Sequence, residues 1–133
     1  DIVIATSACS ESTFALKQGG FEGDIIPADQ ELVKRLNQSA QNLTLKTHSG
    51  IIHSSDVFYY QEEATSNKEL YEKYPVVCGE MESFALFHNA SVFGKHAATI
   101  LTISDTAFSK EAVSPEGRQS SFHNMIKIAL GIL

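Results

Sequence analysis

Short apolar runs along this chain alternate with segments of helical periodicity. Residues 2–5, 76–78 and 97–103 are almost entirely apolar or β-branched, which predicts buried strands. A β-rich stretch at 45–53 alternates in polarity, and an apolar and aromatic run follows at 57–60, so we expect strands there as well. Strands that alternate with helices indicate a layered α/β domain.

Three segments are predicted to be helices. Apolar residues recur at helical spacing after Asp29, a candidate N-cap, which predicts a helix over about 29–43. Residues 81–93 are apolar on almost all sides and are predicted to form a buried helix that ends at Gly94. A Ser-Pro pair at 114–115 is typical of the start of a last helix. The apolar face of that helix is expected to consist of Phe122, Met125, Ile126, Ala129, Leu130 and Leu133.

Polar segments separate these elements. Residues 6–23 are rich in Ser, Thr and Gly and predict a long loop, whereas the polar residues 61–73 predict a solvated helix. A length of 133 residues fits one compact domain. Because the chain starts directly in a strand-like run, we expect this domain to be incomplete at its N-terminus.

The composition narrows the range of functions. A formal charge of −6 argues against a nucleic-acid partner, which would need a basic face. No apolar stretch approaches the length of a transmembrane helix, and no signal peptide is visible, so no membrane partner and a cytoplasmic location are expected. Cys9 and Cys78 lie far apart in the sequence and are expected to be reduced, buried thiols.

A carboxylate stands directly after the expected strand at 97–103. Ligands of open α/β sheets bind outside the carboxyl ends of the strands, so Asp105, preceded by Ser104, is a candidate site residue. Partial burial at that place would make it a usable general acid. The alternative is that Asp105 only caps the following turn.

Two further carboxylates flank a methionine at the start of the expected helix over 81–93. Acidic residues near a helix N-terminus are favoured by the helix dipole, which explains one carboxylate better than two. Because a buried Glu is rare unless it is paired, Glu80, Met81 and Glu82 also fit a site that accepts hydrogen bonds from two vicinal hydroxyls, as on a ribose. The spacing is compatible with both interpretations.

Other polar and aromatic residues have weaker claims to a function. Arg118, one turn into the last helix, can pair with a carboxylate or bind an anion, or it is a surface residue. Phe58 belongs to an aromatic run that can stack on a flat ligand, although core packing is the more common use of such a run. The five histidines show no metal-ligand spacing, and His88 is expected to be a satisfied core residue, so we expect no metal site.

In chain order, these segments resemble the bacterial-type, hexamer-forming purine nucleoside phosphorylases. The resemblance covers essentially the whole chain, with small length differences near residues 61–70. It is carried by Glu80–Glu82 before a helix, Thr102–Asp105, Arg118–Gln119 leading into Phe122–Leu130, and the segments 7–12 and 54–59. It implies a three-layer αβα sandwich with a mixed central sheet, of which residues 1–133 are the C-terminal portion of a single domain.

The resemblance also implies a reaction, the phosphorolysis of purine ribonucleosides and deoxyribonucleosides to free base and the pentose 1-phosphate. Asp105 would protonate N7 of the purine, Arg118 would pair with Asp105 as the last helix closes, and Ser104 would help to line the base pocket. Phe58 would stack on the base. No cofactor is implied, phosphate is the co-substrate, and relatives assemble as homo-oligomers, namely hexamers built from dimers.

For the sugar, the resemblance assigns Glu82 to the ribose hydroxyls, with Glu80 and Met81 beside it. The phosphate-binding Gly and Arg residues of the family lie in an N-terminal half that this sequence does not contain. Gly79 stands where relatives often carry a branched apolar residue.

Three competing interpretations remain open at this point. A uridine phosphorylase lacks an acid at the place of Asp105. A methylthioadenosine or adenosylhomocysteine nucleosidase uses water and generally lacks the later Arg118. The third interpretation is a truncated, non-catalytic nucleoside-binding fragment, which the abrupt start of the chain favours.

Overall fold

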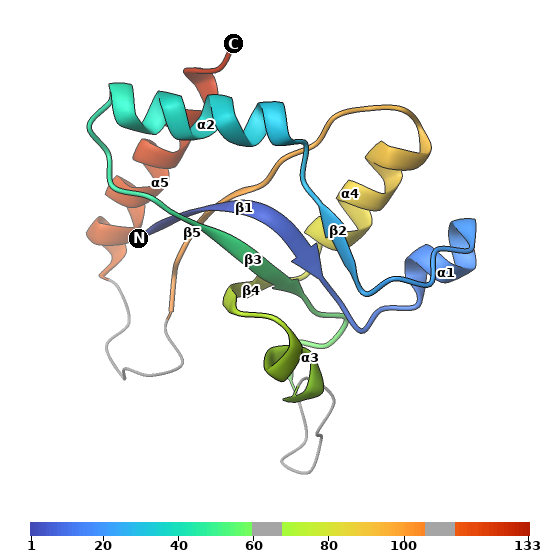
Figure 1. Ribbon diagram of the computed structural model, residues 1–133. Coiled ribbons are helices and arrows are strands. Elements are labelled where there is room, and N and C mark those ends of the chain that lie inside the picture. The colour runs from blue at the N-terminus through green and yellow to red at the C-terminus, as the bar shows by residue number, and fades with distance from the viewer. Residues whose placement is uncertain (60–67, 106–113) are drawn as a thin grey trace.

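The computed structural model describes residues 1–59, 68–105 and 114–133 of the chain (Figure 1). Within these residues, strands and helices alternate almost throughout. The strands are β1 (Ile2–Cys9), β2 (Ile25–Pro27), β3 (His48–Ser54), β4 (Val76–Glu80) and β5 (Ile100–Thr102). The helices are α1 (Phe14–Gly19), α2 (Gln30–Asn42), α3 (Lys68–Lys73), α4 (Ser83–Val92) and α5 (Pro115–Leu130).

The strands form one mixed sheet around β1. Strand β3 pairs with β1 in parallel and β4 pairs with β3 in parallel. On the other side of β1, two short strands pair antiparallel with its two ends, β2 with Ser7–Cys9 and β5 with Ile2–Ile4. Residues 2–5 are buried because β1 is covered on both faces, which accounts for their continuous apolar run.

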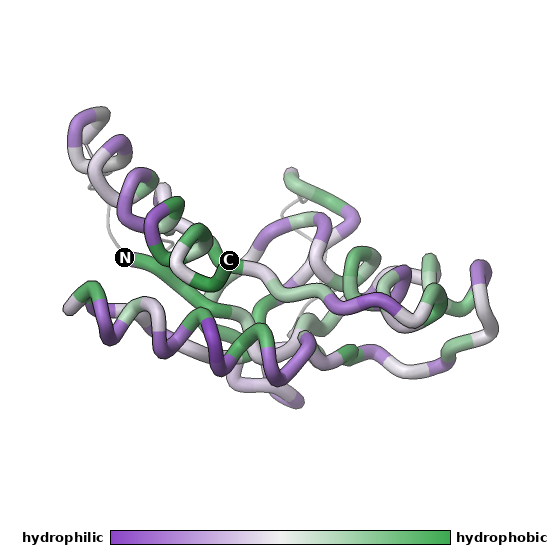
Figure 2. Tube along the Cα trace, turned by 90° about the horizontal axis from the view of Figure 1, so that it is seen from above, coloured by the Kyte–Doolittle hydropathy of each residue, from purple (hydrophilic) through white to green (hydrophobic). Residues whose placement is uncertain are grey.

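Helices cover the sheet on both sides, as the expected three-layer α/β arrangement requires. Figure 2 shows β1 running between α2 and α5. Helix α2 begins at its predicted cap, where Asp29 Oδ1 accepts a hydrogen bond from Leu32 N at 2.9 Å. Its buried side faces the sheet, and Ser39 Oγ donates to the Ile128 carbonyl at 2.9 Å, which ties α2 to α5. Helix α5 begins at the predicted Ser114 cap.

The core lies where the sheet meets these helices. Ile4, Ile52, Phe84 and Ile128 are buried there, one each from β1, β3, α4 and α5. The two thiols are unpaired, and burial raises the pKa of Cys9 and of Cys78 to about 11. Within the described residues, none of the helices is long and apolar enough to span a bilayer.

Several sequence expectations about strands and loops were wrong. Strand β1 continues to Cys9, and α1 lies inside the segment 6–23 that was expected to be a loop. Residues 55–59 form no strand, because the chain turns away from the sheet after Ser54 and leaves Val57 and its neighbours exposed. Of the solvated helix expected over 61–73, the structure describes only the part from residue 68, as α3.

Helix α4 is buried on one face only, contrary to the expectation. Phe84, Phe87 and His88 face the core, whereas Leu86 and Val92 are about half exposed, because the sheet covers only one side of the helix. The helix ends as predicted before Gly94, whose φ of +60° suits a residue without a side chain.

His88 was expected to be a core residue with its hydrogen bonds satisfied, and only its place in the core is confirmed. The ring is buried between the aromatic rings of Phe14 and Phe21, at centroid distances of 5.9 and 6.0 Å. Among the described residues, its Nε2 has no hydrogen-bond partner. The imidazole therefore serves mainly as a flat packing surface between α1 and α4.

The buried side of the last helix matches the expected apolar face only in part. Ile128 is fully buried, and Met125 and Ile132 pack partly against the core. Phe122 and Leu130 are more than half exposed, since the sheet reaches only one side of α5. The apolar periodicity identified the helix and the inward position of Met125 correctly, but it placed Phe122 and Leu130 on the buried side and omitted Ile128.

Helix α3 is anchored to the segment before β2. Asp24 accepts hydrogen bonds from Lys73 Nζ and from the Tyr74 hydroxyl, both at 2.6 Å. These two bonds hold the pKa of the Asp24 carboxyl below its usual range, the Lys73 bond having the larger effect. Because the ion pair is largely exposed to solvent, its contribution to stability is modest.

Asp24→Asn is expected to make the protein less sensitive to acid. A carboxyl with a lowered folded-state pKa stabilises the fold above its unfolded pKa of about 4, and this stabilisation is lost as the pH falls through the folded value. The urea midpoint should therefore fall less between pH 6 and pH 3 in the variant than in the parent protein, with exposed Glu22→Gln as the control. An equally steep fall in Asp24→Asn would contradict this role.

Candidate functional site

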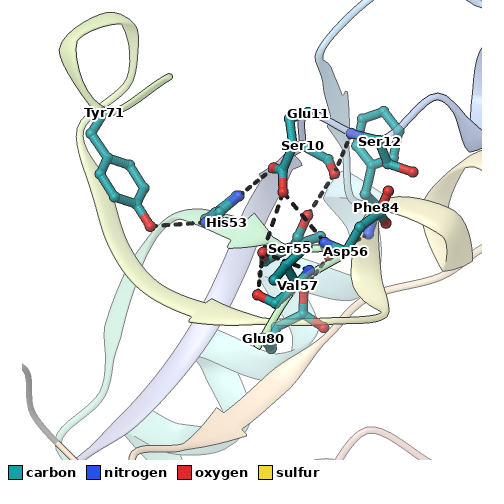
Figure 3. Close-up of polar contacts among 11 residues, drawn as sticks. Ser10, Glu11, Ser12, His53, Ser55, Asp56, Val57, Tyr71, Glu80 and Phe84 are labelled. Atoms are coloured by element: carbon teal, nitrogen blue, oxygen red, sulfur yellow. Dashed lines mark hydrogen bonds and ion pairs between the residues drawn. The ribbon is translucent and has the colours of Figure 1, made fainter. Parts of the chain in front are cut away.

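The carboxyl ends of three parallel strands meet at one edge of the sheet. Strands β1, β3 and β4 end there at Cys9, Ser54 and Glu80, and the pairing of Ser54 with Glu80 holds the last two side by side. Polar residues follow each strand at this edge (Figure 3). Ligands of α/β sheets commonly bind in this position.

The carboxylate of Glu80, the last residue of β4, binds the beginning of the helix that follows. Its Oε2 accepts hydrogen bonds from Glu82 N at 2.9 Å, from Ser83 N at 2.8 Å and from Ser83 Oγ at 2.9 Å. Its Oε1 accepts from the buried Ser54 hydroxyl, which in turn accepts from Phe84 N at 2.9 Å. Glu80 therefore satisfies the free amides at the start of α4, the role that the helix dipole favours for a carboxylate.

Glu82 differs from Glu80 in its surroundings. It occupies the N-cap position of α4 without a capping bond from its side chain, and its carboxylate is exposed apart from a 3.3 Å contact with Met81 N. Met81 beside it is also exposed. Of the two carboxylates, Glu82 is therefore the one that retains free acceptor positions for a ligand.

Phe58 lies on a turn attached to the same edge. The turn begins at Ser55, whose N donates to the Glu80 carbonyl at 2.9 Å. The Phe58 side chain is 69% exposed and meets Tyr59 edge-on at a centroid distance of 4.8 Å. The structure thus brings Phe58 to the same strand ends as Glu80, Met81 and Glu82.

Ser104 and Asp105 lie elsewhere in this chain. They follow β5, which runs antiparallel to β1, so they emerge near the beginning of β1 rather than at its end. The Asp105 carboxylate is exposed, contrary to the expected partial burial, and accepts a hydrogen bond from Ser104 Oγ at 2.9 Å. Arg118 belongs to α5, and its side chain lies outside the described residues.

A buried histidine at this edge was missed by the sequence analysis. His53, the penultimate residue of β3, lies between Glu11 and Tyr71, with its Nε2 2.6 Å from Glu11 Oε2 and its Nδ1 2.9 Å from the Tyr71 hydroxyl. Burial raises the pKa of Glu11, but the bonds from His53 and from backbone amides outweigh it and lower the pKa overall. The feature that could have revealed this contact is that Glu11 and His53 lie at the ends of two neighbouring strands.

No cluster of three or more His, Cys, Asp or Glu side chains that would suit a metal ion occurs in residues 1–59, 68–105 and 114–133. The chemistry available at the edge is that of carboxylates, hydroxyls and an exposed aromatic ring. These groups suit a polyhydroxylated ligand with a flat ring system better than they suit an anion.

Comparison with known proteins places the chain in a family. A model of the phosphorylase superfamily matches residues 1–130. The chain is 38% identical to the DeoD-type purine nucleoside phosphorylase of Caldanaerobacter subterraneus and 35% identical to that of Bacillus velezensis, over 99% and 98% of its length. It spans 56% and 55% of those proteins. The resemblance inferred from the sequence is confirmed.

Solved structures agree with this assignment. The fold matches that of a Toxoplasma gondii purine nucleoside phosphorylase in complex with immucillin-H, with a TM-score of 0.81 at 22% identity over 99% of this chain and 54% of that one. A Plasmodium knowlesi homologue of the P. falciparum enzyme gives a TM-score of 0.76 at 28% identity, over 99% and 52%. With a family match over nearly all of its residues, the chain belongs to the phosphorylase superfamily.

Proposed function

We propose that the full-length protein cleaves purine ribonucleosides and deoxyribonucleosides with phosphate, releasing the free base and the pentose 1-phosphate. The observation that carries the proposal is the meeting of a free carboxylate, Glu82, and an exposed aromatic ring, Phe58, at one edge of the sheet. A nucleoside presents the two matching groups, vicinal hydroxyls and a flat base. The DeoD-type relatives support the same reaction class.

In this proposal Glu82 accepts hydrogen bonds from the ribose hydroxyls. Cleavage of a glycosidic bond develops oxocarbenium character at the sugar, so a sugar held in one orientation meets the incoming phosphate productively. Glu80 supports this indirectly, because its carboxylate holds the N-terminus of α4 on which Glu82 stands. Met81 adds an apolar surface beside the sugar.

For the base, we assign stacking to Phe58 and proton donation at N7 to Asp105. Ser104 holds the Asp105 carboxylate, and Arg118 is its partner when the last helix closes. The roles of Ser104, Asp105 and Arg118 rest on the family resemblance, since within this chain Asp105 lies near the beginning of β1 and Glu82 lies beyond its end.

The remaining parts of the proposal concern the whole protein. In this proposal residues 1–133 form the C-terminal portion of a single phosphorylase domain. The family resemblance implies that the phosphate site lies in the part of the relatives that this chain does not span. No cofactor is needed, because phosphate itself is the nucleophile. We further propose a homo-oligomer that works in the cytoplasm in purine salvage.

The test is the dependence of base release on phosphate. Full-length protein is incubated with inosine, guanosine or adenosine, with and without inorganic phosphate, and the free base and the sugar product are quantified. Base release is expected only with phosphate, in equal amount to ribose 1-phosphate. Equal release in its absence would identify a nucleosidase instead, and no release or binding in either condition would refute both enzymatic assignments.

A further inference from the structure

A row of three hydrogen-bonded side chains leads to the turn that begins at Ser55 (Figure 3). Glu11 follows β1, His53 belongs to β3 and Tyr71 belongs to α3. His53 is only 2% exposed, so its ring makes its polar contacts inside the protein. None of the roles proposed above uses this row.

The neutral His53 ring with its proton on Nε2 satisfies both ring nitrogens. With the proton on Nε2, the ring donates to Glu11 Oε2 at 2.6 Å and accepts at Nδ1 from the Tyr71 hydroxyl at 2.9 Å. Tyr71 also meets the imidazole edge-on, at a centroid distance of 5.3 Å. A buried imidazole bonded on both sides has little freedom to rotate, so it fixes the orientation of Glu11.

The other oxygen of Glu11 faces the turn. Glu11 Oε1 lies 3.2 Å from Ser55 Oγ and 3.4 Å from Asp56 N, both hydrogen-bond donors. The Ser55 hydroxyl also accepts from Val57 N at 3.1 Å, and its single proton is shared between Glu11 Oε1 and the Val57 carbonyl oxygen, which lies 2.8 Å away. The carboxylate of Glu11 therefore contacts Ser55 and Asp56, the first two residues of the turn that leads to Phe58.

We infer that Glu11 is a positioning residue for the base, holding the Ser55–Phe58 turn so that the Phe58 ring faces the purine. Among the described residues, the ring contact of Phe58 is with Tyr59, and the residue is 69% exposed, so the backbone of the turn decides from where its side chain leaves the chain. His53 and Tyr71 act behind Glu11 by fixing its carboxylate. This inference rests on the proposed function, in which Phe58 stacks on the base.

The test is steady-state kinetics of full-length Glu11→Gln, with inosine and inorganic phosphate varied separately. Glutamine keeps the size of the side chain but loses the charge that binds His53 and the turn. The KM for inosine is expected to rise about tenfold, the size expected for one charge-assisted hydrogen bond, while the KM for phosphate stays within about twofold. Equal rises in both constants, or no rise in either, would overturn the inference.

A double-mutant cycle separates positioning from general destabilisation. If Glu11 acts through Phe58, then adding Glu11→Gln to Phe58→Ala should raise the KM for inosine little further. Multiplying effects would show that Glu11 acts independently of the ring. The exposed Glu22→Gln is the matched control and should behave as the parent protein does.

A second variant covers the case in which Glu11→Gln does not fold. Tyr71→Phe keeps the ring against His53 and removes only the hydroxyl, so a smaller rise in the KM for inosine is expected. An unchanged KM in a folded Tyr71→Phe variant would contradict the row as a positioning device. The parent protein is assayed in parallel, so a failure of the proposed function shows as absent turnover in the parent itself.

Discussion

Asp105→Asn in the full-length protein is expected to lower kcat for purine release by about 10²–10⁴-fold, the usual contribution of a general acid. The leaving purine must gain a proton at N7, and an amide of the same shape cannot supply one. The side chain is exposed and its bond within the described residues is from Ser104 Oγ, so the fold should tolerate the change. Initial rates of base release with saturating phosphate measure the effect.

Two further variants make this prediction specific. Exposed Glu31→Gln should retain the parent rate, whereas Glu82→Gln should chiefly raise the KM for the nucleoside, because it weakens the hold on the sugar. Within this chain, Asp105 and Glu82 follow strands that end at opposite ends of β1. An unchanged rate in Asp105→Asn would therefore mean that the acid comes from another part of the protein.

Phe84→Ala is expected to lower the free energy of unfolding by about 3–5 kcal/mol, the range for truncating a large buried aromatic side chain. Phe84 is 2% exposed and lies in the core cluster between α4 and the sheet. Its loss leaves a cavity under helix α4, whose N-cap is Glu82. Urea unfolding monitored by circular dichroism measures the change.

Leu86→Ala on the same helix is the matched control. Leu86 is 46% exposed and faces away from the sheet, so its truncation should cost less than about 1 kcal/mol. Similar losses in the two variants would mean that both faces of α4 are covered in the full-length protein. That outcome would restore the buried helix that the sequence pattern predicted.

Local sequence signals predicted the capped helix ends well, whereas they missed the end of β1 at Cys9 and the short helix α1. Asp29 and Ser114 each cap a helix through a side-chain bond to a nearby backbone amide, and Gly94 ends a helix through its backbone freedom. These effects act within one helical turn, so they can be predicted from adjacent residues. The burial of β1 on both faces was likewise visible as a continuous apolar run. The candidate ligand groups Phe58, Glu80 and Glu82 were also named from the sequence.

What the sequence by itself determined is thus the class of fold, the family and the identity of the candidate groups. The tertiary structure alone decided how these groups are used, because strand pairing brings together residues far apart in the chain. Pairing of β3 with β4 lets the buried Ser54 hydroxyl and the α4 amides occupy Glu80 and leaves Glu82 free. The antiparallel pairing of β5 places Asp105 near the beginning of β1, away from the strand ends where Glu82 lies. The contact between Glu11 and His53 joins residues 42 positions apart, a distance over which no local pattern carries information.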